Sequence, residues 1–181
     1  MRRLLSASAI ALAVAFAALP SAASAQGALF RAEYLKQLDD IEKKYVQLAE
    51  ATPADKYGWR PGKGVRSMGE VFLHVAGANF MIPGALGMKS PVMTGNDFET
   101  KTTDKAQIVD LLKKSIAHAR AAATHVTDAD MAQEVNLFGM KLSKLGVLLL
   151  IANHLHEHMG QSIAYARSNG IVPPWSAKGG M

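Results

Sequence analysis

The sequence predicts an all-α protein, folded as an up-and-down four-helix bundle in a single domain. Two patterns and the chain length lead to this prediction. Four segments carry apolar residues at the three- and four-residue spacing that places them on one face of a helix. The segments between them contain the glycines and prolines typical of turns. A chain of 181 residues has about the length of one domain and is long enough to bury a core.

The first 25 residues are predicted to be a secretory signal peptide. Arg2 and Arg3 precede an uncharged run at 4–19, and Ala23 and Ala25 supply the small residues of a cleavage site. The alternative is an uncleaved anchor, but the run is shorter than the roughly 20 residues of a membrane-spanning helix. We therefore expect a mature domain at 26–181, exported to the periplasm, with no stable membrane anchor after cleavage.

The composition excludes several classes of function. The chain has no cysteine, which excludes cysteine nucleophiles, disulfides and cysteine-ligated zinc sites. The formal net charge of +5 falls to +3 when Arg2 and Arg3 leave with the signal, since 5 − 2 = 3. This charge is small and no basic stripe interleaved with aromatic residues is present, so we expect no nucleic-acid partner.

The first two helices are expected at Leu29–Ala51 and from Ser67 to about Met81. Pro53 ends the first, and a loop rich in glycine and proline follows it. Ser67 and Glu70 have the spacing of a capping box, in which each side chain bonds the backbone N–H of the other residue. The apolar face of the first helix consists of Leu35, Leu38, Ile41, Tyr45 and Leu48.

A third helix is expected after the connection at 84–102. Thr102 or Thr103 can cap its start, and its apolar pattern fades near Val126. Residues 127–142 are ambiguous, with a short turn at the beginning and an extended stretch towards the end as one interpretation. The apolar face of the third helix consists of Ile108, Leu111, Leu112, Ile116 and Ala119.

The fourth helix is expected from Ser143 to about Ser168. Gly170 suits the left-handed position just beyond a helix end, and two prolines that cannot continue the helix follow it. The segment Leu145–Ile151 is apolar almost all round. We therefore predict that this helix is the most buried of the four.

Three of the six histidines fall within residues 154–158. Because each helical residue advances by about 100°, His154 and His158 project to the same side, whereas His156 points to the far side. Two imidazoles at this spacing can bind one cation, but a stable site needs at least three protein ligands. His74 is the candidate for the third, because it shares a helix face with apolar residues and is expected to point into the bundle. The alternative is that these are structural histidines of the core.

The remaining histidines and one competing motif are given other interpretations. His118 and His125 are expected at the rim or in solvent, and His156 is expected to be structural or exposed. The residues from His154 to His158 also match the inverted zinc-peptidase motif H-x-x-E-H, with Glu157 as general base. No acidic residue follows Glu157 to complete such a site, so we disfavour this alternative.

Several motifs of the chain resemble the DinB-like superfamily of damage-inducible proteins. The segment 56–61, with its Trp-Arg-Pro sequence, is similar to a loop of that family, and 65–71 is similar to the entry of its second helix. The most specific stretch is His158-Met159-Gly160-Gln161, which continues through Tyr165, Arg167 and Asn169 to the segment 170–174. The similarity covers roughly residues 35–175, nearly all of the mature domain.

The resemblance implies a four-helix bundle with a three-histidine site for a divalent metal ion, often zinc or nickel. By position, the implied ligands are His74, His154 and His158. Some members of the family are metal-dependent transferases that act on low-molecular-weight thiols, others are thiol-dependent isomerases, and homodimers are common. The export signal of this chain departs from that pattern, because cytoplasmic cofactor thiols are not expected where an exported protein works.

The sequence thus leads to three functional hypotheses. The first is an exported metal-dependent transferase or hydrolase with an unknown small-molecule substrate, in which Glu157 and Gln161 are the candidate catalytic or ligand-orienting residues. The second is a non-catalytic, stress-related protein that binds metal through the same histidines. The third is a structural bundle whose histidines bind nothing. Trp59 and Tyr165 are candidates for the mouth of a pocket, with structural roles as the alternative.

Overall fold

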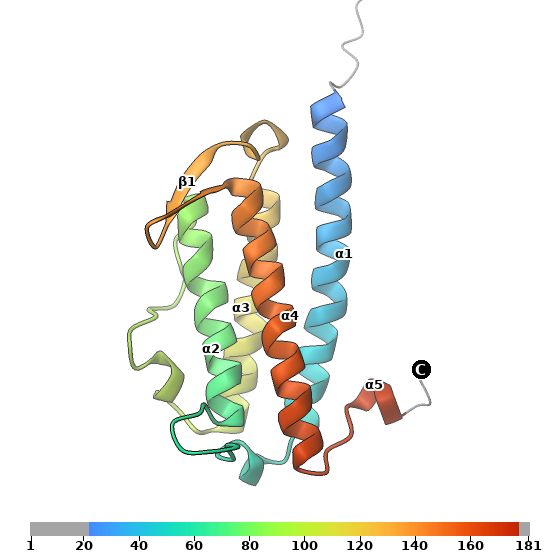
Figure 1. Cartoon of the computed structure of the whole chain (residues 1–181), viewed down its shortest axis with the longest axis vertical. Coiled ribbons are helices and arrows are strands. Elements are labelled where there is room, and N and C mark those ends of the chain that lie inside the picture. Colours follow the sequence, from blue (N-terminus) through green and yellow to red (C-terminus); the bar gives the residue numbers. More distant parts are fainter. Residues whose placement is uncertain (1–21, 178–181) are drawn as a thin grey trace, which may run out of the picture.

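The computed structural model describes residues 22–177, and four long helices make up most of this part of the chain (Figure 1). The predicted all-α four-helix bundle is confirmed. Its helices are α1 (Ala22–Ala51), α2 (Met68–Met81), α3 (Lys105–His125) and α4 (Lys144–Ser168), and a short helix α5 (Pro174–Ala177) follows. The short 3-10 helices are η1 (Ala54–Lys56), η2 (Ile82–Leu86), η3 (Phe98–Thr100) and η4 (Asp128–Asp130).

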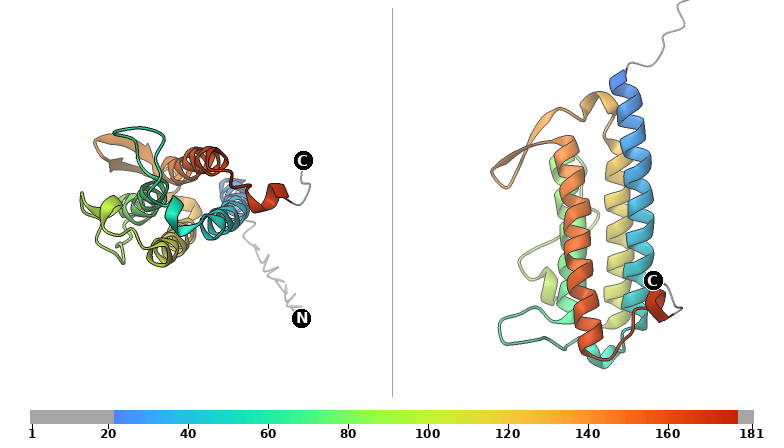
Figure 2. Two further views of the ribbon diagram at one scale, coloured as in Figure 1. Left: turned by 90° about the horizontal axis from the view of Figure 1, so that it is seen from below. Right: turned by 45° about the vertical axis from the view of Figure 1, so that its right-hand side comes forward.

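Seen along its axis, the bundle places each helix beside two others (Figure 2). The neighbours are α2 with α3, α3 with α1, α1 with α4, and α4 with α2. The helices α2 and α3 run in the same direction, because Gly69 lies against Ile108 near their starts and Phe80 packs against His118 further along. The connection at 82–104 therefore returns the whole length of the bundle before α3 begins, so α2 and α3 depart from the alternating up-and-down order that was predicted. This arrangement makes α2–α4 and α1–α3 two opposite faces.

The first helix begins at Ala22, seven positions before the predicted start at Leu29. Most of the predicted signal peptide lies outside the described residues, and the expected cleavage point after Ala25 falls in the first turn of α1. The division into signal and mature domain stays a prediction. Within residues 22–177, none of the helices combines the length and the apolar character needed to cross a membrane.

The start of α2 follows the predicted capping box. Ser67 Oγ accepts a hydrogen bond from the backbone N–H of Glu70, and the Glu70 carboxylate accepts one from the backbone N–H of Ser67 at 2.7 Å. The prediction that the fourth helix is the most buried was wrong. Ten of the 14 residues of α2 are buried, against ten of the 25 in α4, where Leu149 is 45% exposed. The reason is that α2 is covered by α3, by α4 and by η3.

The third helix is capped by Asp104 rather than by Thr102 or Thr103. The Asp104 carboxylate accepts a hydrogen bond from the backbone N–H of Gln107 at 2.8 Å. Thr102 instead uses its hydroxyl to accept from the backbone N–H of Asp104 at 3.1 Å. Both residue types are good caps, so the sequence alone left this choice open.

A β-hairpin joins α3 and α4 where the sequence was ambiguous. Strand β1 (Glu134–Leu137) pairs antiparallel with β2 (Met140–Ser143), so the extended stretch is confirmed and the bundle carries a small two-stranded addition. Phe138 and Gly139 form its turn, with φ values of 53° and 83°. Positive φ at both central residues is the geometry that tight hairpins favour.

The fourth helix begins and ends as predicted. Ser143 Oγ accepts a hydrogen bond from the backbone N–H of Gly146 at 3.0 Å, and the helix ends at Ser168. Gly170 has φ 72°, the left-handed conformation expected of it, and the N–H of Ile171 donates to the carbonyl of Ala166 at 2.9 Å. Such a turn satisfies carbonyls that a helix end leaves free.

Candidate metal centre

The three histidines singled out in the sequence meet between α2 and α4. His74 comes from the middle of α2, and His154 and His158 come from successive turns of α4. One ring nitrogen of each lies within 4.8 Å of the corresponding nitrogens of the other two. The ring centroid of His74 lies 5.0 Å from that of His154 and 4.6 Å from that of His158. The predicted convergence of residues some eighty positions apart is therefore confirmed.

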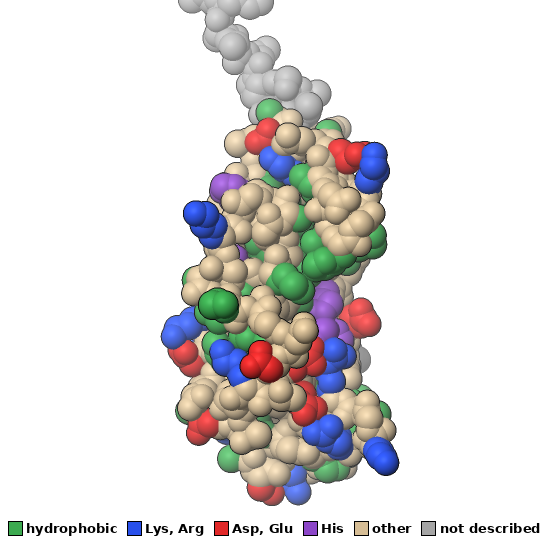
Figure 3. Space-filling model, turned by 90° about the vertical axis from the view of Figure 1, so that its left-hand side faces the viewer, with side chains coloured by type: hydrophobic (Ala, Val, Ile, Leu, Met, Phe, Trp, Pro, Cys, Tyr) green, Lys and Arg blue, Asp and Glu red, His purple; other side chains and the backbone are tan. Residues whose placement is uncertain are grey.

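Histidine side chains reach the surface on the face shown in Figure 3, between a hydrophobic region and a group of charged side chains. His74 keeps 23% of its side-chain area exposed, whereas His158 is 9% exposed as a whole residue. A small ligand in solution can thus reach the cluster from one side. The other sides of the cluster are packed into the bundle.

Two of the three rings are oriented by hydrogen bonds at Nδ1. Glu99 Oε1 lies 2.6 Å from Nδ1 of His74, and Gln161 Oε1 lies 2.7 Å from Nδ1 of His158. Because a carboxylate and an amide oxygen only accept hydrogen bonds, each Nδ1 carries the proton. The Nε2 atoms of His74 and His158 then carry lone pairs, and Nε2 of His74 accepts a hydrogen bond from Nε2–H of His154 at 3.1 Å in the absence of metal.

His154 has no such support at Nδ1. This atom is buried and has no hydrogen-bond partner among the described residues. Burial, together with the positive potential of His158, His74 and Arg66, lowers the pKa of His154 to about 4. Burial also lowers the pKa of His74, although its hydrogen bond with Glu99 acts in the opposite direction. Both rings are therefore neutral at pH 7, which is the protonation state of a metal ligand.

The carboxylate beside the site was not found by the sequence reasoning. Glu99 lies in η3, on the long connection between α2 and α3, and Arg66 holds it through two hydrogen bonds. The sequence named Glu157 as a candidate catalytic or ligand-orienting residue, but its side chain is exposed and makes none of the hydrogen bonds at the cluster. A catalytic role for Glu157 stays a prediction. No periodicity or motif in the sequence marks Glu99.

Gln161 and Tyr165 extend the network along α4. The amide nitrogen of Gln161 donates to the Tyr165 hydroxyl at 3.0 Å, while its amide oxygen accepts from His158. The Tyr165 ring packs edge-on against Trp59, with ring centroids 5.4 Å apart. Gln161 therefore orients a histidine of the cluster, and its predicted role towards a bound ligand stays a prediction.

The other histidines lie outside the cluster. His156 Nδ1 lies 2.8 Å from the Ala152 carbonyl of its own helix, so it bonds the backbone as a structural residue does. His125 is exposed at the end of α3. His118 is half-buried against Phe80 and its Nε2 is buried with no partner among the described residues. None of the three approaches the centre between α2 and α4.

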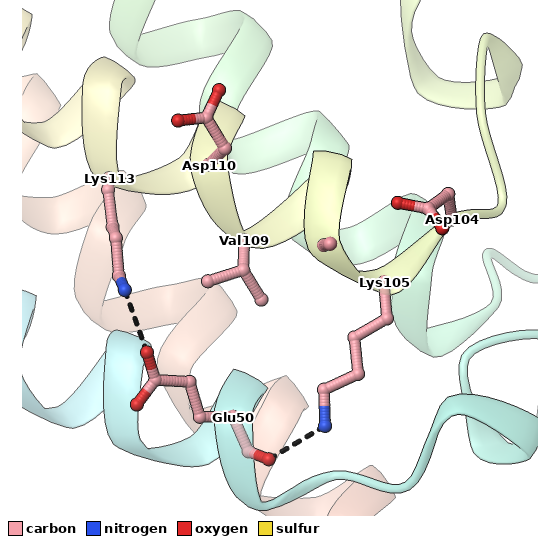
Figure 4. A pocket seen from close by; sticks show the side chains of 7 residues that line it. Glu50, Asp104, Lys105, Val109, Asp110 and Lys113 are labelled. Carbon is pink, nitrogen blue, oxygen red and sulfur yellow. Dashed lines mark hydrogen bonds and ion pairs between the residues drawn. The ribbon is translucent and has the colours of Figure 1, made fainter.

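Two cavities differ in their relation to this cluster. One of about 310 Å³ lies beside His74 and Glu99, and is otherwise lined by α2 and by residues 94–98. A larger one of about 510 Å³ lies on the opposite face between α1 and α3, lined mainly by charged side chains (Figure 4). In the second, Lys113 pairs with the Glu50 carboxylate and Lys105 donates to the Glu50 carbonyl, both at 2.7 Å. Its charges are thus already engaged within the protein.

The donor set at the histidine cluster fits a divalent metal ion. Nitrogen ligands of one tetrahedral zinc ion, at about 2.0–2.1 Å from the metal, lie roughly 3.3 Å apart. The observed 3.1 Å between Nε2 of His74 and Nε2 of His154 is close to that separation. Neutral imidazoles with Nδ1 bonded to acceptors are the usual form of histidine at a metal. His74, His154 and His158 can therefore hold one ion together.

Comparison with known proteins agrees with the fold. A family model described as the DinB superfamily matches residues 37–162. A DinB-like protein from Bacillus cereus ATCC 10987 is 20% identical with a TM-score of 0.69, covering 78% of this chain and 93% of that chain. A DinB-like protein from Bacillus subtilis is 19% identical with a TM-score of 0.61, covering 77% and 93%. At these identities the likeness concerns the fold alone, and no curated protein matches the chain. Because the family model spans well over half of its length, the chain belongs to the DinB superfamily.

Proposed function

We propose that this protein is exported to the periplasm, binds one divalent metal ion through His74, His154 and His158, and acts as a metal-dependent transferase or hydrolase on a small molecule. Zinc and nickel are the candidate ions, because both accept neutral imidazole ligands. The observation that carries the proposal is the convergence of three ring nitrogens within 4.8 Å of one another, two of them on rings fixed by acceptors at Nδ1.

Three protein ligands suit a catalytic site better than a closed one. Structural zinc sites in proteins are almost always closed by four protein ligands, whereas catalytic sites keep a position for water or substrate. Among the described residues, the group of metal-ligating side chains contains these three histidines and no fourth member. A bound divalent ion supplies a nucleophile near neutral pH by lowering the pKa of a coordinated water or thiol.

The residues of this chain would hold and orient that chemistry. Glu99 and Gln161 keep the rings of His74 and His158 in the tautomer that offers Nε2. The cavity of about 310 Å³ beside His74 and Glu99 gives a small substrate room next to the ligands. Its walls include Gly77, Ala78, Met81 and Phe98, so it favours a molecule with an apolar part.

The proposal is tested by the metal content of the purified mature protein. We expect about one divalent ion per chain by elemental analysis of the wild type, and much less in His74→Ala and His158→Ala, because two imidazoles alone hold an ion weakly. His125→Ala is the matched control, since this histidine is exposed and distant from the cluster. Unchanged metal content in both ligand variants would contradict the three-histidine site. Screening the metal-loaded protein against thiols and simple esters then tests transferase and hydrolase activity.

A further inference from the structure

The connection between α2 and α3 is fixed on α2 directly beside His74. Phe98 of η3 is 4% exposed and packs edge-on against Phe80, with ring centroids 6.3 Å apart. It also lies over Gly77, where an added Cβ would be 3.1 Å from the Phe98 ring. Gly77 is one helical turn beyond His74. The packing of Phe98 therefore places the next residue, Glu99, at the edge of the histidine cluster.

The Glu99 carboxylate is shared between a histidine and an arginine. Oε1 accepts from His74 Nδ1 at 2.6 Å and from Arg66 Nη2 at 3.0 Å, and Oε2 accepts from Arg66 Nε at 2.5 Å. The paired bonds to Arg66 restrict the carboxylate to one orientation. In that orientation it requires the proton of His74 on Nδ1, which leaves Nε2 free to bind a cation.

The carboxylate also carries its charge at this position. It faces the guanidinium of Arg66, and paired hydrogen bonds from a cation favour the ionised form of a carboxyl group. An ionised carboxylate behind a ligating imidazole makes the ring more basic and holds its orientation. Of the three rings, His74 alone has such a carboxylate, because His158 has the neutral amide of Gln161 and Nδ1 of His154 has no partner among the described residues.

We infer that Glu99 is a positioning residue of the metal centre, held in place by Arg66, and that it sets metal affinity by fixing the tautomer and orientation of His74. The inference rests on the proposed metal-binding function and adds to it a residue outside the ligand set. It also means that the long connection between α2 and α3 is part of the site, although it contributes no ligand.

The first test is zinc affinity, measured by competition with a chromophoric chelator on the full mature chain. We expect Glu99→Ala to weaken zinc binding by about 10- to 100-fold, the usual loss when the carboxylate behind a metal-bound histidine is removed. Glu99→Gln should weaken it less, because its amide oxygen can still accept from Nδ1. Arg66→Met should fall between the wild type and Glu99→Ala, since the carboxylate remains but loses its anchor.

Two other carboxylates make the test specific. Glu50→Gln on the opposite face is the matched control, and its zinc affinity should equal that of the wild type. Glu157→Gln tests the rival carboxylate on α4. If Glu157→Gln weakens zinc binding and Glu99→Ala does not, the inference is overturned.

A second test does not need metal. Nitrogen-detected NMR of the histidine rings in the metal-free protein reports which nitrogen carries the proton. We expect the Nδ1–H tautomer for His74 in the wild type and a shift towards the Nε2–H tautomer in Glu99→Ala. If the wild type binds no zinc but His74 shows this shift, the proposed function fails, whereas the control of the His74 tautomer by Glu99 stands. If the tautomer is the same in both proteins, the positioning role is wrong whatever the zinc affinity.

Discussion

The two opposite faces of the bundle both gather ionisable side chains, but they satisfy them in different ways. On the α1–α3 face, Lys113 meets the Glu50 carboxylate and Lys105 meets the Glu50 carbonyl (Figure 4). Lys105 also donates to the Thr52 carbonyl. On the α2–α4 face, His74 and His154 bring two ring nitrogens to 3.1 Å. The first set of groups is complementary within the protein. The second set consists of imidazole rings, which are groups of one kind whose nitrogens meet at a single point.

The size of a cavity therefore does not identify the functional site in this protein. The larger cavity lies on the α1–α3 face, where opposite charges already neutralise one another. The α2–α4 face carries the arrangement that costs stability in the absence of a ligand, because a buried polar atom without a partner is unfavourable. A cation held by the Nε2 atoms would bring these like groups into one coordination shell. Natural proteins often place such locally unfavourable arrangements at functional sites.

The largest effect is expected from acid, which should lower the free energy of unfolding of the metal-free protein. The pKa of His154 is lowered to about 4 in the folded protein, against 6.5 for an ordinary histidine. Between these values the unfolded chain binds a proton that the folded chain does not, so stability is complete above pH 6.5 and falls as the pH drops towards 4. The metal-free protein should lose roughly 1–2 kcal/mol of unfolding free energy over this window, after discounting for the partly exposed ring.

Urea unfolding of the metal-free protein at pH 7, 6, 5 and 4.5 measures this loss. The lower limit stays above the range in which most carboxylates titrate, so that histidines dominate the change. Glu50→Gln on the α1–α3 face should follow the wild-type curve. A stability that is constant between pH 7 and 4.5 would contradict the neutral, buried state of the cluster.

Much of the fold was predictable because its signals are local. The capping box of Ser67 and Glu70 and the left-handed Gly170 depend on residues within one turn, and both were found where the sequence placed them. The burial of α4 was mispredicted because it depends on which neighbours cover a helix. Leu149 belongs to an apolar run, yet it faces solvent and is 45% exposed. The cap of α3 was mispredicted because Thr102 and Asp104 are both suitable caps.

The candidate site shows the same division between local and distant signals. The spacing of His154 and His158 is a property of one helix, so the sequence was enough to pair them. His74 required a correct guess of which helices face each other. Glu99 could not be found, because it lies 25 positions from His74 on a connection whose path depends on the packing of Phe98. Residues that support a ligand from a loop carry no periodic signal.

Replacing His154 with an apolar residue should separate stability from metal binding. In the metal-free protein, His154→Leu should raise the free energy of unfolding by about 1 kcal/mol, because removing the buried Nδ1 without a partner outweighs losing the part-buried hydrogen bond to His74. It should also abolish tight metal binding, since only two ligands remain. Chemical unfolding and elemental analysis measure the two effects.

His118→Leu is the matched control for this change. His118 is half-buried and its Nε2 lacks a partner among the described residues, but it lies outside the cluster. The His118→Leu variant should show a similar rise in the free energy of unfolding and should keep its metal. If His154→Leu destabilises the metal-free protein, the histidine cluster does not lower the stability of the α2–α4 face in the absence of metal.

The smallest effects are expected on the α1–α3 face, where they separate hydrogen bonds to backbone carbonyls from an exposed ion pair. Lys105 donates to the carbonyls of Glu50 and Thr52, each at 2.7 Å, at the end of α1. These carbonyls have no partner within the helix, so Lys105→Met should lower the free energy of unfolding by about 1 kcal/mol. Lys113→Gln removes an exposed ion pair and should change it by less than about 0.5 kcal/mol. Neither variant should alter zinc affinity, because the core of the bundle separates this face from the histidines. A measurable loss of zinc binding in Lys105→Met would show instead that the end of α1 is coupled to the metal centre.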